Sequence, residues 1–440
     1  MKLHFRTIRT VFFSFLIAFV VMPAMAQHDE DGTSLIIVED AGGIALTDET
    51  ADSDTLDADT VVAAPAPVDL PWPQNIQAGI DKLLDGKLFK STQVGLMVWD
   101  LDADSVIYSH NEKFRLRPAS TQKMVTAVAA LDYLGTNYEF RTELRYRGTV
   151  VDSTRTLHGD IYCIGGMDPM FNSKDLKMFV DSIRALGIDT IRGNLYADLS
   201  FKDKDRLGSG WCWDDDNPVL SPLLLNRKDY FREQLLRSLS ERGIVLTGTT
   251  AIHTPPAGTT ILLCSRERHI NEILRPMMKR SDNLYAEAMF YQIAHKMGGR
   301  YATAKMARQR IDATIRKAGI SDKDSHSADG SGLSLYNYET PEIELMLLRY
   351  AYRNSDIYRL LYYSMPIAGV DGTLRKRMKG TAAYNNVHAK TGTVTGVSAL
   401  AGYCTAKNGH RLCFSIINQG IRNSREGRNF QDQVCAILCR

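Results

Sequence analysis

The sequence predicts a mixed α/β protein of the α+β type, in which one domain is interrupted by a second domain inserted into it. The apolar run Met124–Leu131 indicates a buried helix. The runs Val397–Thr405 and Leu412–Asn418 indicate an antiparallel hairpin. Between these regions, the alternating segment Phe140–Tyr146 predicts a strand and Leu176–Leu186 predicts a helix. The interval is therefore expected to be a folded α+β insertion.

Residues 1–26 have the composition of a secretory signal peptide. Three basic side chains precede an apolar run from Val11 to Val21, and the small-residue pattern Ala24-Met25-Ala26 follows. The run is short for a membrane-spanning helix, which needs about 20 residues. An uncleaved anchor helix is the alternative. We expect an exported, periplasmic protein with no integral membrane span in its mature form.

Residues 27–73 are predicted to form an acidic, unfolded tether. Twelve acidic side chains and no basic one lie between Asp29 and Asp69, a composition that buries too little apolar surface to fold. The formal net charge of +2 therefore conceals a basic body. Its basic residues are scattered and not clustered with aromatic side chains. This pattern favours anionic cell-wall polymers over nucleic acid as the partner.

The seven cysteines leave at least one thiol unpaired, and none has the spacing of a zinc site with histidine. If Asn408-Gly409 forms a two-residue turn, Cys404 and Cys413 lie opposite each other, where a disulfide could form. Two reduced core thiols are an equally good interpretation. We expect no metal and no cofactor.

A nucleophile is predicted at Ser120 in the segment Ser120–Lys123. Pro118 suits the start of the apolar helix, which places Ser120 in the first turn, where free backbone N–H groups favour negative charge. Lys123 lies three residues on, on the same helix face. A buried lysine can lose its proton and act as the base that a serine needs. The alternative is a helix cap followed by a surface lysine.

The segment Ser281–Asn283 predicts a second group of active-site residues. Ser281 would relay a proton to a leaving amine, and the Asn283 amide would fix the substrate backbone. The structural alternative is that Ser281 caps the helix continuing from Leu284.

The segment Lys390–Thr393 predicts a third group, on a strand. Lys390 would supply positive charge, and the hydroxyls of Thr391 and Thr393 would bind a carboxylate. Gly392 would let a ligand approach the strand closely. The structural alternative is an edge strand, where lysine is common. In this order and in these contexts, the three motifs form the signature of class A β-lactamases and penicillin-binding proteins.

Over roughly residues 75–425 the chain resembles the D-alanyl-D-alanine carboxypeptidase/endopeptidases of peptidase family S13, the class C low-molecular-mass penicillin-binding proteins. The further resembling segments are Gly159–Tyr162, Gly165–Pro169, Gly193–Asp198, Gly210–Asp215, Asp329–Ser334 and Gly369–Leu374. After Leu225-Asn226 the chain passes almost directly to Leu235-Leu236, where larger members have a further nested domain.

The resemblance implies the transpeptidase fold of penicillin-binding proteins and serine β-lactamases, an antiparallel sheet flanked by helices with an all-helical part. We expect a discontinuous catalytic domain, residues 74–140 and 267–440, interrupted by an inserted domain, residues 141–266.

The resemblance also implies the reaction and its partners, peptidoglycan stem peptides ending in D-Ala-D-Ala and β-lactam antibiotics. Ser120 would be acylated by the penultimate D-alanine, with Lys123 as base. Backbone N–H groups of Ser120 and Thr393 would form the oxyanion hole. Ser281 and Lys390 would pass a proton to the departing D-alanine.

Two other functions are compatible with the motifs. A serine β-lactamase needs fast deacylation, which class A enzymes assign to a glutamate acting through a water. Glu342 and Glu344 lie in the relevant interval, although neither is in an E-x-x-L-N pattern. A non-catalytic wall-binding scaffold would show a substitution at a motif position, and none is substituted. The choice between carboxypeptidase and endopeptidase cannot be made from the sequence.

Overall fold

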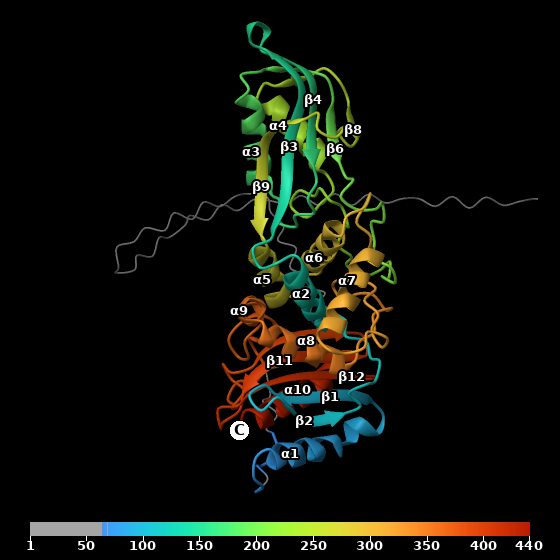
Figure 1. The fold of residues 1–440 in the computed structure, drawn as a ribbon, viewed down its shortest axis with the longest axis vertical. Helices are drawn as coiled ribbons and strands as arrows, with labels where there is room; N and C mark the ends of the chain where they lie inside the picture. The colour runs from blue at the N-terminus through green and yellow to red at the C-terminus, as the bar shows by residue number, and fades with distance from the viewer. Residues whose placement is uncertain (1–63, 68) are drawn as a thin grey trace, which may run out of the picture. The chain divides into compact units, whose positions relative to one another are not determined.

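Two strands near residue 100 and three near the C-terminus form a five-stranded antiparallel sheet. This computed structural model describes residues 64–67 and 69–440. The sheet order is β10-β11-β12-β1-β2 (Figure 1). Its strands are β1 (Gln93–Asp100), β2 (Ser105–His110), β10 (His388–Val394), β11 (Val397–Thr405) and β12 (Arg411–Gln419). The predicted hairpin is confirmed as β11 and β12, and β10 is an edge strand.

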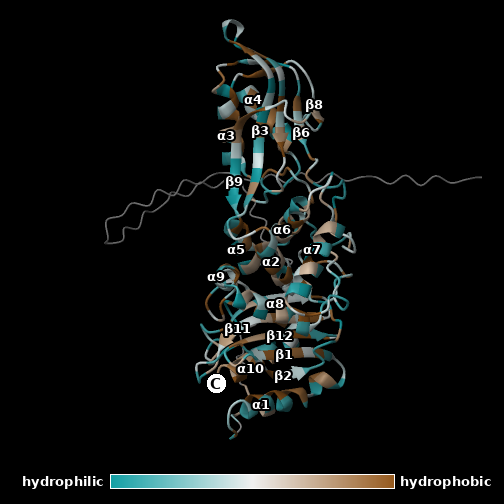
Figure 2. Cartoon of the chain, in the orientation of Figure 1, coloured by the Kyte–Doolittle hydropathy of each residue, from teal (hydrophilic) through white to brown (hydrophobic). Residues whose placement is uncertain are grey.

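Helices cover both faces of this sheet, which is why β11 is buried over almost its whole length. α1 (Gln74–Leu84) and α10 (Ser424–Leu438) pack on one face. α8 (Pro341–Arg353) packs on the other, with further helices behind it. These are α2 (Gln122–Tyr133), α5 (Ile270–Lys279), α6 (Asn283–Lys296), α7 (Ala304–Lys317) and α9 (Ser355–Ser364). Figure 2 shows the hydrophobic residues along β1 and β12.

The predicted helix after Pro118 is confirmed as a 3₁₀ turn, η2 (Ala119–Thr121), that leads directly into α2. Every residue of α2 from Gln122 to Leu131 is buried, because α5, α6, α7 and α8 surround it. A helix that is mostly apolar on all sides, as α2 is, is stable when other elements surround it in this way. The remaining 3₁₀ turns are η1 (Lys87–Lys90), η3 (Asp152–Thr154) and η4 (Gly372–Leu374).

A second, seven-stranded sheet lies between α2 and α5 in the chain. It follows the order β7-β5-β4-β3-β9, with β6 paired to β4 and β8. Its elements are β3 (Glu139–Val151), β4 (Thr156–Ile164), α3 (Ser173–Arg184), β5 (Thr190–Arg192), β6 (Leu195–Asp198), α4 (Phe231–Glu241), β7 (Val245–Leu246), β8 (Thr250–Ile252) and β9 (Ile261–His269). The expected α+β character of this interval is confirmed. The proposed limits, residues 141 and 266, fall inside β3 and β9.

The turn between β11 and β12 corrects the predicted pairing of two cysteines. Cys404 pairs with Leu412, and Cys413 pairs with Tyr403. The connection has three residues, closed by hydrogen bonds between Ala406 and both Gly409 and His410, and Gly409 has a φ of +92°. This geometry is a turn followed by a left-handed glycine, not a two-residue turn. The cysteines therefore face opposite sides of the sheet. Of the two interpretations left open, the crosslink is wrong, and two reduced core thiols are present. All seven cysteines are free thiols.

Two predictions about the N-terminus fall largely on residues that the structure leaves undescribed. The signal peptide, residues 1–26, and the tether up to residue 63 lie outside the described residues. α1 begins at Gln74, one residue after the end predicted for the tether. Across the described part of the chain, no helix is both long enough and apolar enough to cross a membrane.

Candidate active site

Ser120 lies at the junction of η2 and α2, where the backbone is unusual. Ala119, which precedes it, has a φ of +49°, a conformation that costs an alanine free energy and is typical of functional sites. The loop containing Gly332 holds this turn in place, because a Cβ on Gly332 would lie 1.8 Å from the Ala119 carbonyl oxygen. The nucleophile predicted from sequence is therefore held on a strained turn.

Lys123 is fully buried beside Ser120, on the same side of the helix start, as the three-residue spacing predicts. Its Nζ lies 2.8 Å from Ser120 Oγ, 2.7 Å from Asn283 Oδ1 and 2.8 Å from the Ser331 carbonyl oxygen. These partners come from η2, α6 and the loop after α7. As a neutral amine in this position, Lys123 can take the hydroxyl proton of Ser120.

A second lysine lies across the site on β10. The Nζ of Lys390 donates to Ser281 Oγ at 2.8 Å and to the Thr391 carbonyl oxygen at 2.6 Å. Complete burial lowers the pKa of Lys390 well below 10.5, and the positive charge that Lys123 has when it is protonated lowers it further. A lysine with a lowered pKa gives up its proton more readily, which suits proton transfer through the Ser281 hydroxyl.

Asp282, and not Ser281, caps α6. Its carboxylate accepts from the backbone N–H groups of Leu284 at 3.1 Å and Tyr285 at 3.5 Å. Ser281 has a φ of +60°, which turns the chain just before the cap. The structural alternative for Ser281 is therefore wrong, and its hydroxyl contacts Lys390 instead.

Gly392 brings β10 against the nucleophile turn. A Cβ on this residue would lie 2.7 Å from the Pro118 carbonyl oxygen and 3.1 Å from the Ser120 backbone nitrogen. The sequence suggested that the glycine makes room for a ligand, whereas here it makes room for the backbone beside Ser120. That contact places the edge of β10 next to the N–H groups expected to form the oxyanion hole.

The two threonines of the third motif differ in their surroundings. Thr393 is exposed, and Thr391 is partly buried, with its Oγ1 lying 2.7 Å from Oγ1 of Thr373 in η4. Sequence reasoning missed Thr373 as a site residue, although it lies in the segment Gly369–Leu374 singled out by the resemblance. Sequence reasoning also missed the carbonyl oxygen of Ser331, which lies in the resembling segment Asp329–Ser334.

Two buried glutamates support the site from behind. Glu344 accepts from Thr121 Oγ1 at 2.5 Å and from Ser415 Oγ at 2.7 Å, and burial raises its pKa to about 7. Glu287 accepts from the Gly330 backbone N–H at 3.1 Å. Burial, followed by the charge of Asp329, raises the pKa of Glu287 to about 8. Because both Glu344 oxygens already bind hydroxyls, it is a poor candidate for the deacylating base of a β-lactamase.

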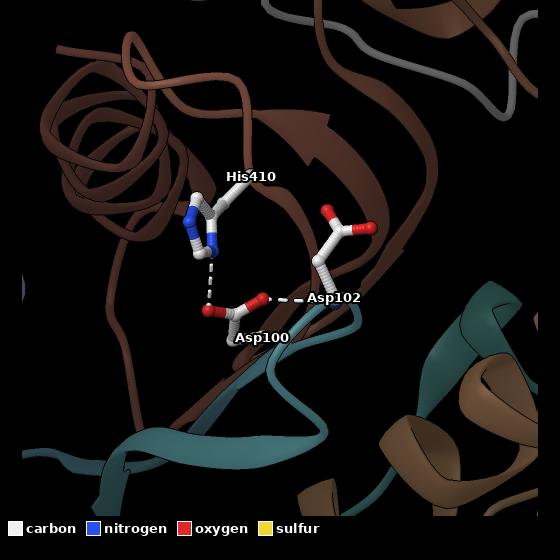
Figure 3. A group of neighbouring side chains, drawn as sticks. All are labelled: Asp100, Asp102 and His410. Atoms are coloured by element: carbon white, nitrogen blue, oxygen red, sulfur yellow. Dashed lines mark hydrogen bonds and ion pairs between the residues drawn. The ribbon is translucent and has the colours of Figure 1, made fainter.

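Among the described residues, one group has ligand atoms close enough for a metal ion. Atoms of Asp100, Asp102 and His410 lie within 4.8 Å of one another (Figure 3). Asp100 already accepts from two backbone N–H groups and lies 2.7 Å from Nδ1 of His410. Asp102 pairs with Arg411. We therefore interpret the group as a link between the loop after β1 and the β11–β12 turn.

Comparison with known families agrees with this geometry. The model of the D-Ala-D-Ala carboxypeptidase 3 (S13) family matches residues 76–224 and 223–440. The chain belongs to this family. A D-alanyl-D-alanine carboxypeptidase of Actinomadura sp. (strain R39) is 26% identical over 78% of this chain and 81% of its own length. The D-alanyl-D-alanine carboxypeptidase DacB of Haemophilus influenzae is 27% identical over 75% of this chain and 86% of its own.

The fold of this S13 family member is also that of a solved structure. The crystal structure of penicillin binding protein 4 from Haemophilus influenzae has a TM-score of 0.75. The match covers 81% of this chain and 98% of that one, at 24% sequence identity. The predicted penicillin-binding-protein fold is therefore confirmed.

Proposed function

We propose that this protein is a serine-type D-Ala-D-Ala carboxypeptidase that acts on peptidoglycan stem peptides through an acyl-enzyme on Ser120. The observation that supports this most is the buried Lys123 Nζ, 2.8 Å from Ser120 Oγ and 2.7 Å from Asn283 Oδ1. A nucleophile, a base and a substrate-binding amide thus meet at one point, as an acyl-transfer site requires. The S13 relatives are named for this activity.

In the proposed acylation, Lys123 takes the proton of the Ser120 hydroxyl as Oγ bonds to the penultimate D-alanine carbonyl carbon. The resulting oxyanion accepts from the N–H groups of Ser120 and Thr393. When the peptide C–N bond breaks, the proton that Lys123 took is passed through Ser281 and Lys390 to the departing D-alanine nitrogen, and Lys123 becomes neutral again. Water then hydrolyses the ester and restores the Ser120 hydroxyl.

The remaining motif residues hold the substrate in this proposal. The Asn283 amide binds the peptide backbone, and the hydroxyls of Thr391 and Thr393 bind the terminal carboxylate. Gly392 keeps β10 close enough to Ser120 for both sets of contacts to act on one peptide. β-Lactam antibiotics present a similar carboxylate and a strained amide to the same groups, so we propose that they acylate Ser120. The expected location is the periplasm.

Labelling with a fluorescent penicillin tests the proposal. Wild-type protein should form a long-lived adduct, Ser120→Ala should form none, and wild type should release D-alanine from a peptide ending in D-Ala-D-Ala. Rapid turnover of penicillin would instead identify a β-lactamase, and penicillin binding without D-alanine release would identify a scaffold. Product analysis on crosslinked muropeptides determines whether crosslinks are also cleaved.

A further inference from the structure

The inserted region built on the second sheet, from β3 to β9 and here called the second sheet unit, contacts the Ser281–Asn283 motif through Arg227. The chain makes a tight turn from Leu225 to Lys228, with hydrogen bonds in both directions between these two residues at 2.9 and 3.0 Å. The two residues at the tip, Asn226 and Arg227, have φ values of +49° and +67°. Left-handed conformation at both positions is the geometry of a type I′ turn. Arg227 therefore projects from a rigid tip.

The base of the turn is fixed to the second sheet unit. Leu225 is buried in the core of that unit, with α3 and α4. The Asn226 backbone N–H donates to the Phe171 carbonyl at 2.9 Å, and its amide donates to Ser173 Oγ at 3.0 Å. The position of Arg227 is consequently set by the second sheet unit. The turn also lies where larger members of the family that the chain resembles have a further nested domain.

Arg227 binds the middle residue of the Ser281–Asn283 motif. Its guanidinium donates to Asp282 Oδ2 at 2.5 Å and to Oδ1 at 3.2 Å. The Asp282 side chain is 9% exposed and that of Arg227 is 49% exposed. A two-pronged ion pair fixes the orientation of a carboxylate more strictly than a point charge does.

Asp282 is joined to the two motif residues on either side of it. The strained backbone of Ser281, φ +60°, precedes it, and Asn283 begins the helix that it caps. Those neighbours contact Lys390 and Lys123, respectively. A rotation of the Asp282 carboxylate would therefore displace both contacts.

We propose that Arg227 is a positioning residue, which sets Ser281 and Asn283 relative to the two lysines by holding Asp282. This inference rests on the proposed function. It assigns the second sheet unit a part in the reaction, because the alignment of the motif then depends on a turn anchored in that unit. Misplacement of reacting groups by about 1 Å can cost 100-fold in rate.

The test measures the acylation rate with fluorescent penicillin, and kcat and KM for D-alanine release, on the whole protein. Arg227→Ala should lower the acylation rate and kcat about 10-fold, with a KM change below about 3-fold. Arg227→Lys should be intermediate, because an ammonium makes one contact where the guanidinium makes two. Lys228→Ala, which removes a positive charge from the same turn, should stay within about 2-fold of wild type.

A double-mutant cycle separates positioning from a general structural effect. Asp282→Asn retains a helix cap but weakens the ion pair. The double variant Arg227→Ala/Asp282→Asn should be no more than about 2-fold slower than the slower single variant, because both changes break one contact. The inference is overturned if the two substitutions slow acylation independently, so that their fold-changes multiply in the double variant. It is also overturned if Arg227→Ala is acylated at the wild-type rate. Wild-type protein that is not acylated would overturn the proposed function, and with it the role of Arg227.

Discussion

Gly392 shows how much of the site depends on the absence of one side chain. Its backbone passes the nucleophile turn so closely that a Cβ would meet two backbone atoms, the Pro118 carbonyl oxygen and the Ser120 nitrogen. Backbone atoms cannot rotate away as the end of a flexible side chain can. The gap between β10 and Ser120, into which the substrate carbonyl must fit, is therefore set by this residue.

We accordingly predict that Gly392→Ala acylates at least 10-fold more slowly, in line with the ~100-fold cost of a misplacement of about 1 Å. The overpacking should lower the free energy of unfolding by about 1 to 3 kcal/mol. Stopped-flow acylation and urea unfolding measure the two effects. Gly409→Asn is the control, because Gly409 has open space around it and asparagine tolerates left-handed backbone. An unchanged acylation rate in Gly392→Ala would show that β10 can move away from the turn.

The contact between Ser120 and Lys123 could be predicted from sequence, because a three-residue spacing on a helix fixes which side chains are neighbours. Ser281 and Lys390 approach each other from segments 109 residues apart, and no local rule joins them. Their pairing could be expected only from the resemblance to the S13 family. Ser331 contributes a carbonyl oxygen, which every residue has, so no residue-type pattern could have identified it.

At the scale of elements, β9 is joined to the segment around α3 by a buried cluster of charges. Arg268, with a side chain that is 6% exposed, pairs with Asp168 at 3.3 Å and Asp175 at 2.6 Å. Burial raises the pKa of Asp168 to about 6. Asp175 also belongs to the capping box of α3. The arginine therefore compensates two carboxylates that would otherwise be costly to bury.

Replacing Arg268 with leucine should lower the free energy of unfolding by about 3 kcal/mol at pH 7, because the buried Asp168 carboxylate then loses its cation. Asp175 would keep its second ion pair, with Arg266 at 2.8 Å. Urea unfolding measures the change. The matched control is Arg141→Leu on the neighbouring strand, whose side chain is 52% exposed and whose ion pairs should contribute less than about 1 kcal/mol. Equal losses in the two variants would contradict a special role for the buried pair.

Elements with strong periodicity could be predicted from the sequence, and their connections could not. The strands β11 and β12 follow from two apolar runs, but their register depends on whether the turn has two or three residues. A one-residue difference reverses the face of every side chain in the pair. That difference separates Cys404 and Cys413, which would face each other, and could form a disulfide, only if the turn had two residues.

At the scale of the whole molecule, two buried glutamates make stability depend on pH. The pKa values of Glu344 and Glu287 are raised to about 7 and about 8, chiefly by burial. In the unfolded chain both titrate near 4.5. Between pH 6.5 and 8.5 the unfolded chain has already lost these protons and the folded chain is losing them. The carboxylates therefore destabilise the fold progressively as the pH rises through this window.

Other ionisable groups with shifted pKa values also change the pH dependence of stability in this window. The effect of one glutamate is therefore found by comparing a variant with the wild type. Desolvation lowers the pKa values of His295 and His388. The unfolded chain therefore holds more of their protons near pH 6.5, and these histidines oppose the glutamates at that end of the window. Lys390, whose pKa is lowered, acts in the opposite direction, because the unfolded chain holds the proton of this lysine more tightly than the folded chain does, so its contribution to stability rises with pH. A single-site change to glutamine isolates the contribution of one carboxyl.

We predict that Glu344→Gln loses less stability than wild type between pH 6.5 and 8.5, with a difference on the order of 1 kcal/mol. The glutamine can still hydrogen-bond Thr121 and Ser415, but it has no proton to release in this window. Urea unfolding at the two pH values measures the slope. Glu233→Gln, at an exposed position on α4, should reproduce the wild-type slope. A Glu344→Gln slope equal to that of wild type would mean that Glu344 is already ionised at pH 6.5, and its two hydroxyl contacts would then stabilise a buried charge behind the nucleophile.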